Sequence, residues 1–327
     1  MKFKIALALT LLISFTQADE TLLSQKLHEL AKSYTTTLQA QDAYLVIMDV
    51  KTGHMVGASD SKSSDEDESL AKLKKYRFEP GNIIQPITYA IAIDYNKTTP
   101  DELLSGHKGK FAIASKYITD EYAFDYVSSE NAVVHSSNIV AAQLGLRLDA
   151  LELHDGLVRL GLKDIFEFDA KYKNNLTIQK LEYEIYRAVA SYGYGFRVTL
   201  LDVAMVYRQF LEPTDNSFLD PTTTSYVKNT LIKAVKEGTG MQGNIQGVVV
   251  GGKTGTAHVI ENGKYVNKYH TSFVGFAEDD TNSYIIGMLI VDPKKQTYAS
   301  QTSAPLFKKT VEMMINMGYL SKSRNLK

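Results

Sequence analysis

Strand-like segments lie near the two ends of this chain, and the long stretch between them has the apolar spacing of helices. Near the start, Asp42–Met48 is a short β-rich apolar run, and His54–Ala58 resumes the strand pattern after the turn Asp49–Gly53. Three further strand-like runs come in the last third of the chain: Gly247–Lys253, Thr271–Ala277 and Tyr284–Val291. Since strands must pair, this pattern predicts an α/β (α+β) fold whose mixed, largely antiparallel sheet forms only when the two chain ends meet.

Helices are expected to flank this sheet and to fill an inserted subdomain. The region from about 98 to 211 is predicted to be mainly helical, with Gly161 ending one helix and Thr199 capping another. The expected helices are Ile83–Tyr95, Asn131–Leu148, Leu151–Leu160, a run from Leu200, Thr224–Lys236 and Pro305–Met317. The polar segment Ser59–Lys75, with its acidic run Asp65–Glu68, is expected to be a solvated loop.

Charge and cysteine content exclude several classes of function. The chain has 36 Lys and Arg residues against 37 Asp and Glu residues, and such a balanced surface argues against a nucleic-acid partner. It has no cysteine, which excludes disulfides, thiol catalysis and cysteine-ligated metal sites. The sequence therefore indicates neither a cofactor nor a metal.

The first 18 residues have the pattern of a signal peptide. Lys2 and Lys4 precede the apolar run Ile5–Phe15, and Thr16–Ala18 supplies small residues for a signal peptidase. That run is too short to cross a hydrocarbon core of about 30 Å, so we expect cleavage after residue 18. A lead-in over 19–41 and one domain over 42–327 would then reach the periplasm as a soluble protein. An uncleaved segment would instead anchor the domain to the inner membrane, facing the periplasm.

Three short motifs place polar side chains beside apolar elements. The first, Phe78–Pro86, reads Phe-Glu-Pro-Gly-Asn-Ile-Ile-Gln-Pro and opens a buried helix. The second, Ser136–Asn138, lies inside a helical pattern and predicts either buried structural hydrogen bonds or a side that faces a cleft. The third, Lys253–Thr256, ends an apolar strand. At a cleft its lysine and threonines would bind a carboxylate and Gly255 would admit a ligand, whereas on an ordinary strand Lys253 is a surface lysine.

In this order, the three motifs resemble the transpeptidase domain of penicillin-binding proteins. The likeness covers about residues 42 to 317 and includes four further segments: Val46–Gly53, Ser191–Thr199, His270–Ala277 and Ser303–Phe307. The resemblance implies the penicillin-binding and β-lactamase-like fold. It also implies a D-alanyl-D-alanine stem peptide of peptidoglycan, or a β-lactam, as the ligand.

The resemblance assigns roles to the motif residues. In the family, a first-motif serine attacks the peptide and forms an acyl-enzyme, and a lysine one turn later activates that serine. The second-motif serine and asparagine transfer protons and hold the peptide, while the Lys-Thr-Gly strand binds its carboxylate. The positions that match are Ser136, Asn138, Lys253, Thr254, Gly255 and Thr256. The nucleophile and lysine positions of the first motif are instead Asn82 and Gln85.

These two replacements remove the reactive groups of the family. The Asn82 amide is a poor nucleophile, and Gln85 lacks the basic amine that would accept a proton. The backbone N–H of Asn82 would still serve an oxyanion hole, and the two amides are expected to hydrogen-bond each other or Ser136. We therefore expect a pseudo-transpeptidase that binds stem peptides or cell-wall assembly proteins without an acyl-enzyme.

Two alternatives stay open. One is an active D,D-transpeptidase or D,D-carboxypeptidase with an unconventional nucleophile. Ser136 is the best substitute, although it is expected to lack the lysine neighbour of the family's nucleophile. Other serines followed three residues later by lysine, at 59, 69, 105 and 225, do not open an apolar helix after Glu-Pro-Gly. The other alternative is a structural scaffold with a vestigial cleft. His135 and His258, close to the motifs, are expected to be structural or solvent-facing.

Overall fold

The computed structural model describes residues 16–167, 176–213, 218–261 and 263–323. The positive and apolar parts of the predicted signal peptide lie outside the described residues. Within them, α1 (Gln17–Leu38) begins next to the predicted cleavage site and spans most of the expected lead-in. The sequence did not reveal this helix. None of the described helices is long and apolar enough to cross a membrane.

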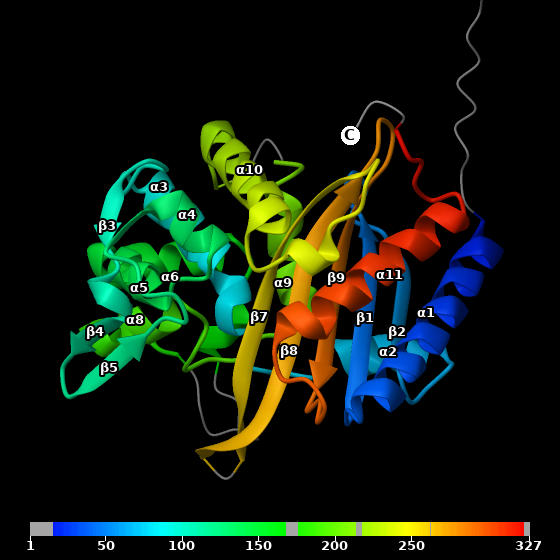
Figure 1. Cartoon of the computed structure of the whole chain (residues 1–327), viewed down its shortest axis with the longest axis horizontal. Helices are drawn as coiled ribbons and strands as arrows, with labels where there is room; N and C mark the ends of the chain where they lie inside the picture. Colours follow the sequence, from blue (N-terminus) through cyan, green and yellow to red (C-terminus); the bar gives the residue numbers. More distant parts are fainter. Residues whose placement is uncertain (1–15, 168–175, 214–217, 262, 324–327) are drawn as a thin grey trace, which may run out of the picture.

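The sheet has five strands in the order β2-β1-β9-β8-β7 and each of its pairings is antiparallel. Its strands are β1 (Asp42–Asp49), β2 (Met55–Asp60), β7 (Val249–Glu261), β8 (Lys264–Glu278) and β9 (Ser283–Val291). Strand β1 pairs with β9, for example Tyr44 with Leu289, so the two chain ends do complete one sheet (Figure 1). The expected fold is confirmed, although β7 and β8 form a much longer hairpin than predicted.

Side chains of β1 alternate between two hydrophobic cores, one on each face of the sheet. Leu45 and Ile47 pack in the core formed with α1 and α11 (Ser303–Asn316), which cover one face. Val46 and Met48 pack in the core on the opposite face. The helices on that face include α3 (Gln85–Asp94), α9 (Leu200–Gln209) and α10 (Pro221–Glu237). This period-two burial explains why β1 reads as a continuous apolar run.

The inserted subdomain lies beside the β7 edge of the sheet (Figure 1). Its helices are α4 (Ser129–Val134), α5 (Asn138–Arg147), α6 (Ala150–Arg159), α7 (Ile178–Leu181) and α8 (Glu184–Ala190). It also contains two small antiparallel two-stranded sheets that were not predicted, formed by β3 (Leu103–Ser105) with β6 (Tyr126–Ser128) and by β4 (Lys110–Ile113) with β5 (Lys116–Thr119). Gly161 follows α6 with φ +102°, and the Thr199 hydroxyl caps α9, both as expected.

The segment Ser59–Lys75 is not the solvated loop that was predicted, because it contains α2 (Glu66–Leu73). The Asp65 carboxylate accepts a hydrogen bond from the Glu68 backbone N–H at 2.9 Å and thereby caps this helix. An acidic run in the first turn also interacts favourably with the positive end of the helix dipole. The polar composition therefore marks a helix start.

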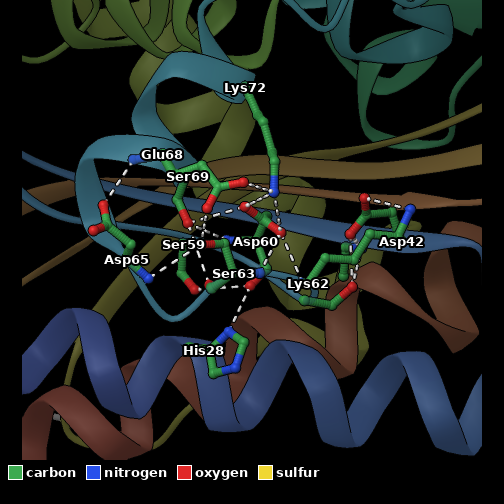
Figure 2. A network of polar contacts seen from close by, with 12 residues as sticks. His28, Asp42, Ser59, Asp60, Lys62, Ser63, Asp65, Glu68, Ser69 and Lys72 are labelled. Carbon is green, nitrogen blue, oxygen red and sulfur yellow. Dashed lines mark hydrogen bonds and ion pairs between the residues drawn. The ribbon is translucent and has the colours of Figure 1, made fainter.

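Asp60 holds α2 against the edge of the sheet (Figure 2). Its carboxylate is buried and accepts hydrogen bonds from the backbone N–H groups of Lys62 and Ser63 at 2.7 and 2.9 Å. The Ser69 hydroxyl donates to it at 3.0 Å and the Lys72 ammonium at 3.1 Å. The serine and lysine at 69 and 72 thus form a structural network in this part of the fold, away from the three motifs.

Candidate functional site

The first motif is a tight turn that leads into α3. Gly81, with φ +57°, starts the 3₁₀ turn Gly81–Ile84, and Pro86 occupies the first turn of the helix that follows. The Gly81 N–H donates to the Gly193 carbonyl at 3.0 Å. A Cβ on Gly193 would lie 2.1 Å from the Gly81 oxygen, and the φ of Gly193 is +90°. The Gly-Tyr-Gly segment, Gly193–Gly195, therefore requires glycine at 193, because it packs directly against the first motif.

Asn82 and Gln85 connect the first motif to the second. The Asn82 side-chain N–H donates to the Ser136 carbonyl at 3.4 Å, and the Gln85 side-chain N–H donates to Asn138 Oδ1 at 3.1 Å. Gln85 is buried, and its Oε1 has no hydrogen-bond partner among the described residues. The expected bond from Asn82 to Ser136 is present, and it reaches the backbone carbonyl.

The second motif lies at a break between α4 and α5, and not inside one helix as predicted. Ser136 has a φ of +62°, which is uncommon for a residue with a side chain. The Ser137 hydroxyl accepts from the Val140 N–H at 3.1 Å and caps α5, while it donates to the Asp120 carboxylate. Asn138 opens α5 and donates to the Thr119 carbonyl at 3.2 Å. The break turns the Ser136 side chain toward β7.

Lys253 lies under the cleft and contacts the second motif. Its side chain has no exposed surface, and its ammonium donates to Ser136 Oγ and to the Thr254 carbonyl. Burial lowers the pKa of Lys253 to about 7. The expectation that Ser136 has no lysine neighbour is therefore wrong, because a lysine distant in sequence takes that place. Lys253 is also not the surface lysine of an ordinary strand.

The threonines of the third motif line the cleft with hydroxyl groups. Thr254 Oγ1 lies 2.7 Å from Thr239 Oγ1, which lies 3.3 Å from Ser136 Oγ. Thr256 Oγ1 accepts from the Ala299 N–H at 3.1 Å. Because Lys253 is buried below them, these hydroxyls form the part of the third motif that a ligand would meet.

Gly255 lies where strand β7 packs against the first motif. A Cβ at this position would lie 2.6 Å from Ser272 Oγ and 2.8 Å from the Pro80 carbonyl oxygen. The absence of a side chain thus allows β7 to approach the first motif closely. The space beside Gly255 is filled by the protein itself, which differs from the predicted approach of a ligand.

The three motifs meet around one cavity of about 410 Å³. Of the predicted site residues, five line it: Asn82, Ser136, Asn138, Thr254 and Thr256. Gln85, Lys253 and Gly255 lie behind this surface. A second cavity of about 890 Å³ adjoins the first and shares Thr119, Asn138, Tyr194 and His258 with it. The described residues contain no group of three or more His, Cys, Asp or Glu side chains able to hold a metal ion.

Comparison with known proteins identifies the family. A family model described as "Penicillin binding protein transpeptidase domain" matches residues 43–312. The chain belongs to this family. The resemblance drawn from the motifs is thereby confirmed.

Curated relatives include a "Probable peptidoglycan D,D-transpeptidase PenA" from Neisseria gonorrhoeae, which is 25% identical over 344 residues, covering 97% of this chain and 58% of the relative. A "Peptidoglycan D,D-transpeptidase FtsI" from Escherichia coli is 25% identical, covering 87% of this chain and 55% of the relative. The chain thus spans less than two thirds of the length of these relatives.

Solved structures share the fold. The transpeptidase domain of penicillin-binding protein 3 from Burkholderia pseudomallei, in its apo form, matches with a TM-score of 0.82 and 24% identity, covering 94% of this chain and 97% of that one. Penicillin-binding protein 3 from Mycobacterium tuberculosis in complex with aztreonam matches with a TM-score of 0.77 and 19% identity, covering 93% and 79%. These likenesses concern the fold alone.

Several polar residues in or beside the two cavities were not predicted as site residues from the sequence. Thr239 joins Thr254 and Ser136, and its Gly-Thr-Gly setting between a helix and a strand was the available signal. Glu79 is buried, accepts from the Gly195 N–H at 2.9 Å and has its pKa raised to about 7 by burial. His135 and His258 were expected to be structural or solvent-facing, and both line the 410 Å³ cavity; burial lowers the pKa of His135.

Proposed function

We propose that this protein is an exported pseudo-transpeptidase that binds peptidoglycan stem peptides, or proteins of cell-wall assembly, without forming the family's acyl-enzyme. One observation carries this proposal: the nucleophile and lysine positions hold Asn82 and Gln85, and both amides are hydrogen-bonded to the second motif. An amide supplies neither an alkoxide nor a basic amine. Removing the nucleophile of a serine hydrolase costs on the order of a millionfold in turnover.

The retained cleft supports binding. The hydroxyls of Thr239, Thr254 and Thr256 surround a cavity that Asn82 and Ser136 also line. Neutral donors of this kind can hydrogen-bond a peptide carboxylate, and Lys253 beneath them adds positive potential when it is protonated. The cleft therefore keeps the means to hold a stem peptide after losing the means to cleave it.

Titration of a stem pentapeptide that ends in D-alanyl-D-alanine tests this proposal. We expect saturable binding by calorimetry, no release of D-alanine, and no covalent adduct with a fluorescent penicillin by intact mass. Thr254→Val should weaken binding by roughly 10-fold or more, since it removes a hydrogen bond to a charged group. The matched control is Thr36→Val, an exposed threonine on α1 at the opposite face of the sheet. Peptide turnover would sink the proposal.

One observation favours a second candidate, an enzyme with a displaced nucleophile. The Lys253 ammonium contacts Ser136 Oγ, and its pKa of about 7 leaves a large neutral fraction at neutral pH. In such an enzyme, Ser136 Oγ would attack the acyl carbonyl and pass its proton to Lys253. The ammonium would then protonate the departing amine, and water would later hydrolyse the ester.

Mapping any penicillin adduct separates the candidates. An adduct at Ser136 that disappears in Ser136→Ala and persists in Asn82→Ala would establish the displaced nucleophile and refute the pseudo-transpeptidase. Stem-peptide binding without an adduct favours the binding protein, and neither adduct nor binding leaves a scaffold with a vestigial cleft. For export, cell fractionation and the mature N-terminus distinguish cleavage near residue 18, with a soluble periplasmic protein, from retention at the inner membrane.

A further inference from the structure

A row of aromatic rings runs along the cleft beside the motif site. The ring centroids of Tyr192 and Tyr194 are 5.4 Å apart, and those of Tyr194 and Tyr265 are 6.0 Å apart. His258 continues the row at 6.4 Å from Tyr265, and Tyr269 lies 4.5 Å beyond it. Because Tyr194 and His258 line both cavities, the row leads from the 890 Å³ cavity, here called the tyrosine groove, into the motif site.

Two further aromatic rings line the tyrosine groove. Tyr117 on the β5 strand and Tyr186 on α8 line it, with 64% and 40% of their surfaces exposed. Ile185 and Val189 of the same helix add aliphatic surface. A ligand in the groove would therefore meet rings from β5 and α8 as well as from the aromatic row.

Two tyrosines of the aromatic row, Tyr194 and Tyr265, are held in place by their hydroxyl groups. Tyr265 donates to the buried Glu79 carboxylate at 3.4 Å, and Tyr194 donates to the Thr256 carbonyl at 3.5 Å. Glu79 also accepts from the Gly195 N–H, so one carboxylate connects the β7–β8 hairpin to the Gly-Tyr-Gly segment. Rings fixed in this way lose little freedom when a ligand binds, which favours affinity.

The charge of the groove restricts its ligand. Among the described residues that line it there is one lysine, Lys116, and no aspartate or glutamate. A ligand with several charges would lose water there without gaining partners, which is costly. Tyrosine rings with hydroxyl and amide groups beside them, such as Ser115 and Asn267, suit a neutral ligand that has apolar faces and hydroxylated edges. Pyranose rings have this chemistry. The cavity volume is also typical of small-ligand sites.

We propose that the tyrosine groove binds a neutral saccharide chain of the N-acetylhexosamine type. The inference deepens the proposed function, on which it rests, since the groove opens into the cleft assigned to the stem peptide. A peptide and the sugar chain that carries it would then occupy adjoining parts of one continuous cleft.

Calorimetric titration with the β-1,4-linked tetramer of N-acetylglucosamine tests the assignment. Tyr186→Ala and Tyr117→Ala should each weaken binding by roughly 5- to 10-fold, as expected for the loss of one aromatic contact. Tyr186→Phe keeps the ring and should bind like the wild type. Tyr226→Ala is the matched control, because Tyr226 on α10 is 40% exposed and is not among the groove residues.

The outcomes separate this inference from the proposed function. Absence of saccharide binding at millimolar concentration, with stem-peptide binding intact, would overturn the groove assignment alone. Saccharide binding without stem-peptide binding would overturn the stem-peptide assignment of the proposed function and leave the groove assignment standing. An uncharged aliphatic peptide that binds in place of the saccharide, and is weakened by the same two substitutions, would show a protein-binding groove and overturn the saccharide assignment.

Discussion

Replacing Lys253 with methionine should remove one specific component of the pH dependence of stability. In the folded protein, burial lowers the pKa of this lysine to about 7 from its ordinary 10.5. Below pH 7 the ammonium is charged in both the folded and the unfolded state, so the folded state bears the full cost of burying it. As the pH rises from 7 toward 10.5, the folded protein releases the proton first and the free energy of unfolding increases.

The size of the effect follows from the two pKa values. One pKa unit corresponds to about 1.4 kcal/mol, so the complete transition is worth on the order of 5 kcal/mol. Between pH 7 and 9, where the folded lysine passes from half to almost fully deprotonated, the gain is about 2 kcal/mol. Methionine has a similar shape and no charge, and the variant should lack this gain.

Urea unfolding at several pH values between about 7 and 9 measures this pH-dependent gain in unfolding free energy. The quantity to follow is the unfolding free energy of the wild type minus that of Lys253→Met, because all other titrating groups are shared and cancel. This difference should rise with pH. Ser136→Ala is the control, since it keeps the buried lysine and should retain the pH dependence of the wild type. Parallel curves for the wild type and Lys253→Met would refute the lowered pKa and weaken the case for a Ser136 nucleophile.

Three further predictions concern the framework of the cleft. Asp60→Asn should lower the unfolding free energy by about 3 kcal/mol, because it neutralises a buried carboxylate that faces several donors; a loss below 1 kcal/mol in urea unfolding would contradict this. Gly193→Ala should lower the unfolding free energy by more than about 2 kcal/mol and weaken stem-peptide binding. Gly161 has a similar φ but open space around it, so Gly161→Ala should show only the cost of backbone strain. Equal losses of unfolding free energy in the two variants would refute the steric argument. Asn82→Ser combined with Gln85→Lys should restore penicillin labelling by intact mass, and a folded double variant without an adduct would mean that the cleft has drifted.

The sheet was predictable because its central strands carry an apolar signal at both chain ends. The strand lengths of the β7–β8 hairpin were not. Lys264, Asn267 and Lys268 occupy the outer half of β8, where side chains are largely exposed and the apolar pattern ends before the strand does. Helix α2 was missed for a related reason, since the acidic residues that start it also resemble a loop.

The candidate site was predictable as a set of motifs but not as a geometry. Ser137 carried a usable helix-cap signal, yet the apolar spacing around it continued across the break and favoured one helix. The contact between Ser136 and Lys253 joins residues 117 positions apart, and the positive φ of Ser136 that directs it is set by tertiary packing. Local patterns contain no information about such a contact.

Under the proposed function, the two amides of the first motif would allow the cleft to persist without the family's chemistry. A buried lysine at position 85 would place a second ammonium in the site that already buries Lys253, and each would raise the cost of charging the other. Gln85 avoids that cost while its N–H group still reaches Asn138, and Asn82 still reaches the Ser136 carbonyl. The bonds between the first and second motifs are thus made by neutral groups. Selection for the shape of the cleft, rather than for acylation, would produce this combination, which is why ligand binding is the property to measure first.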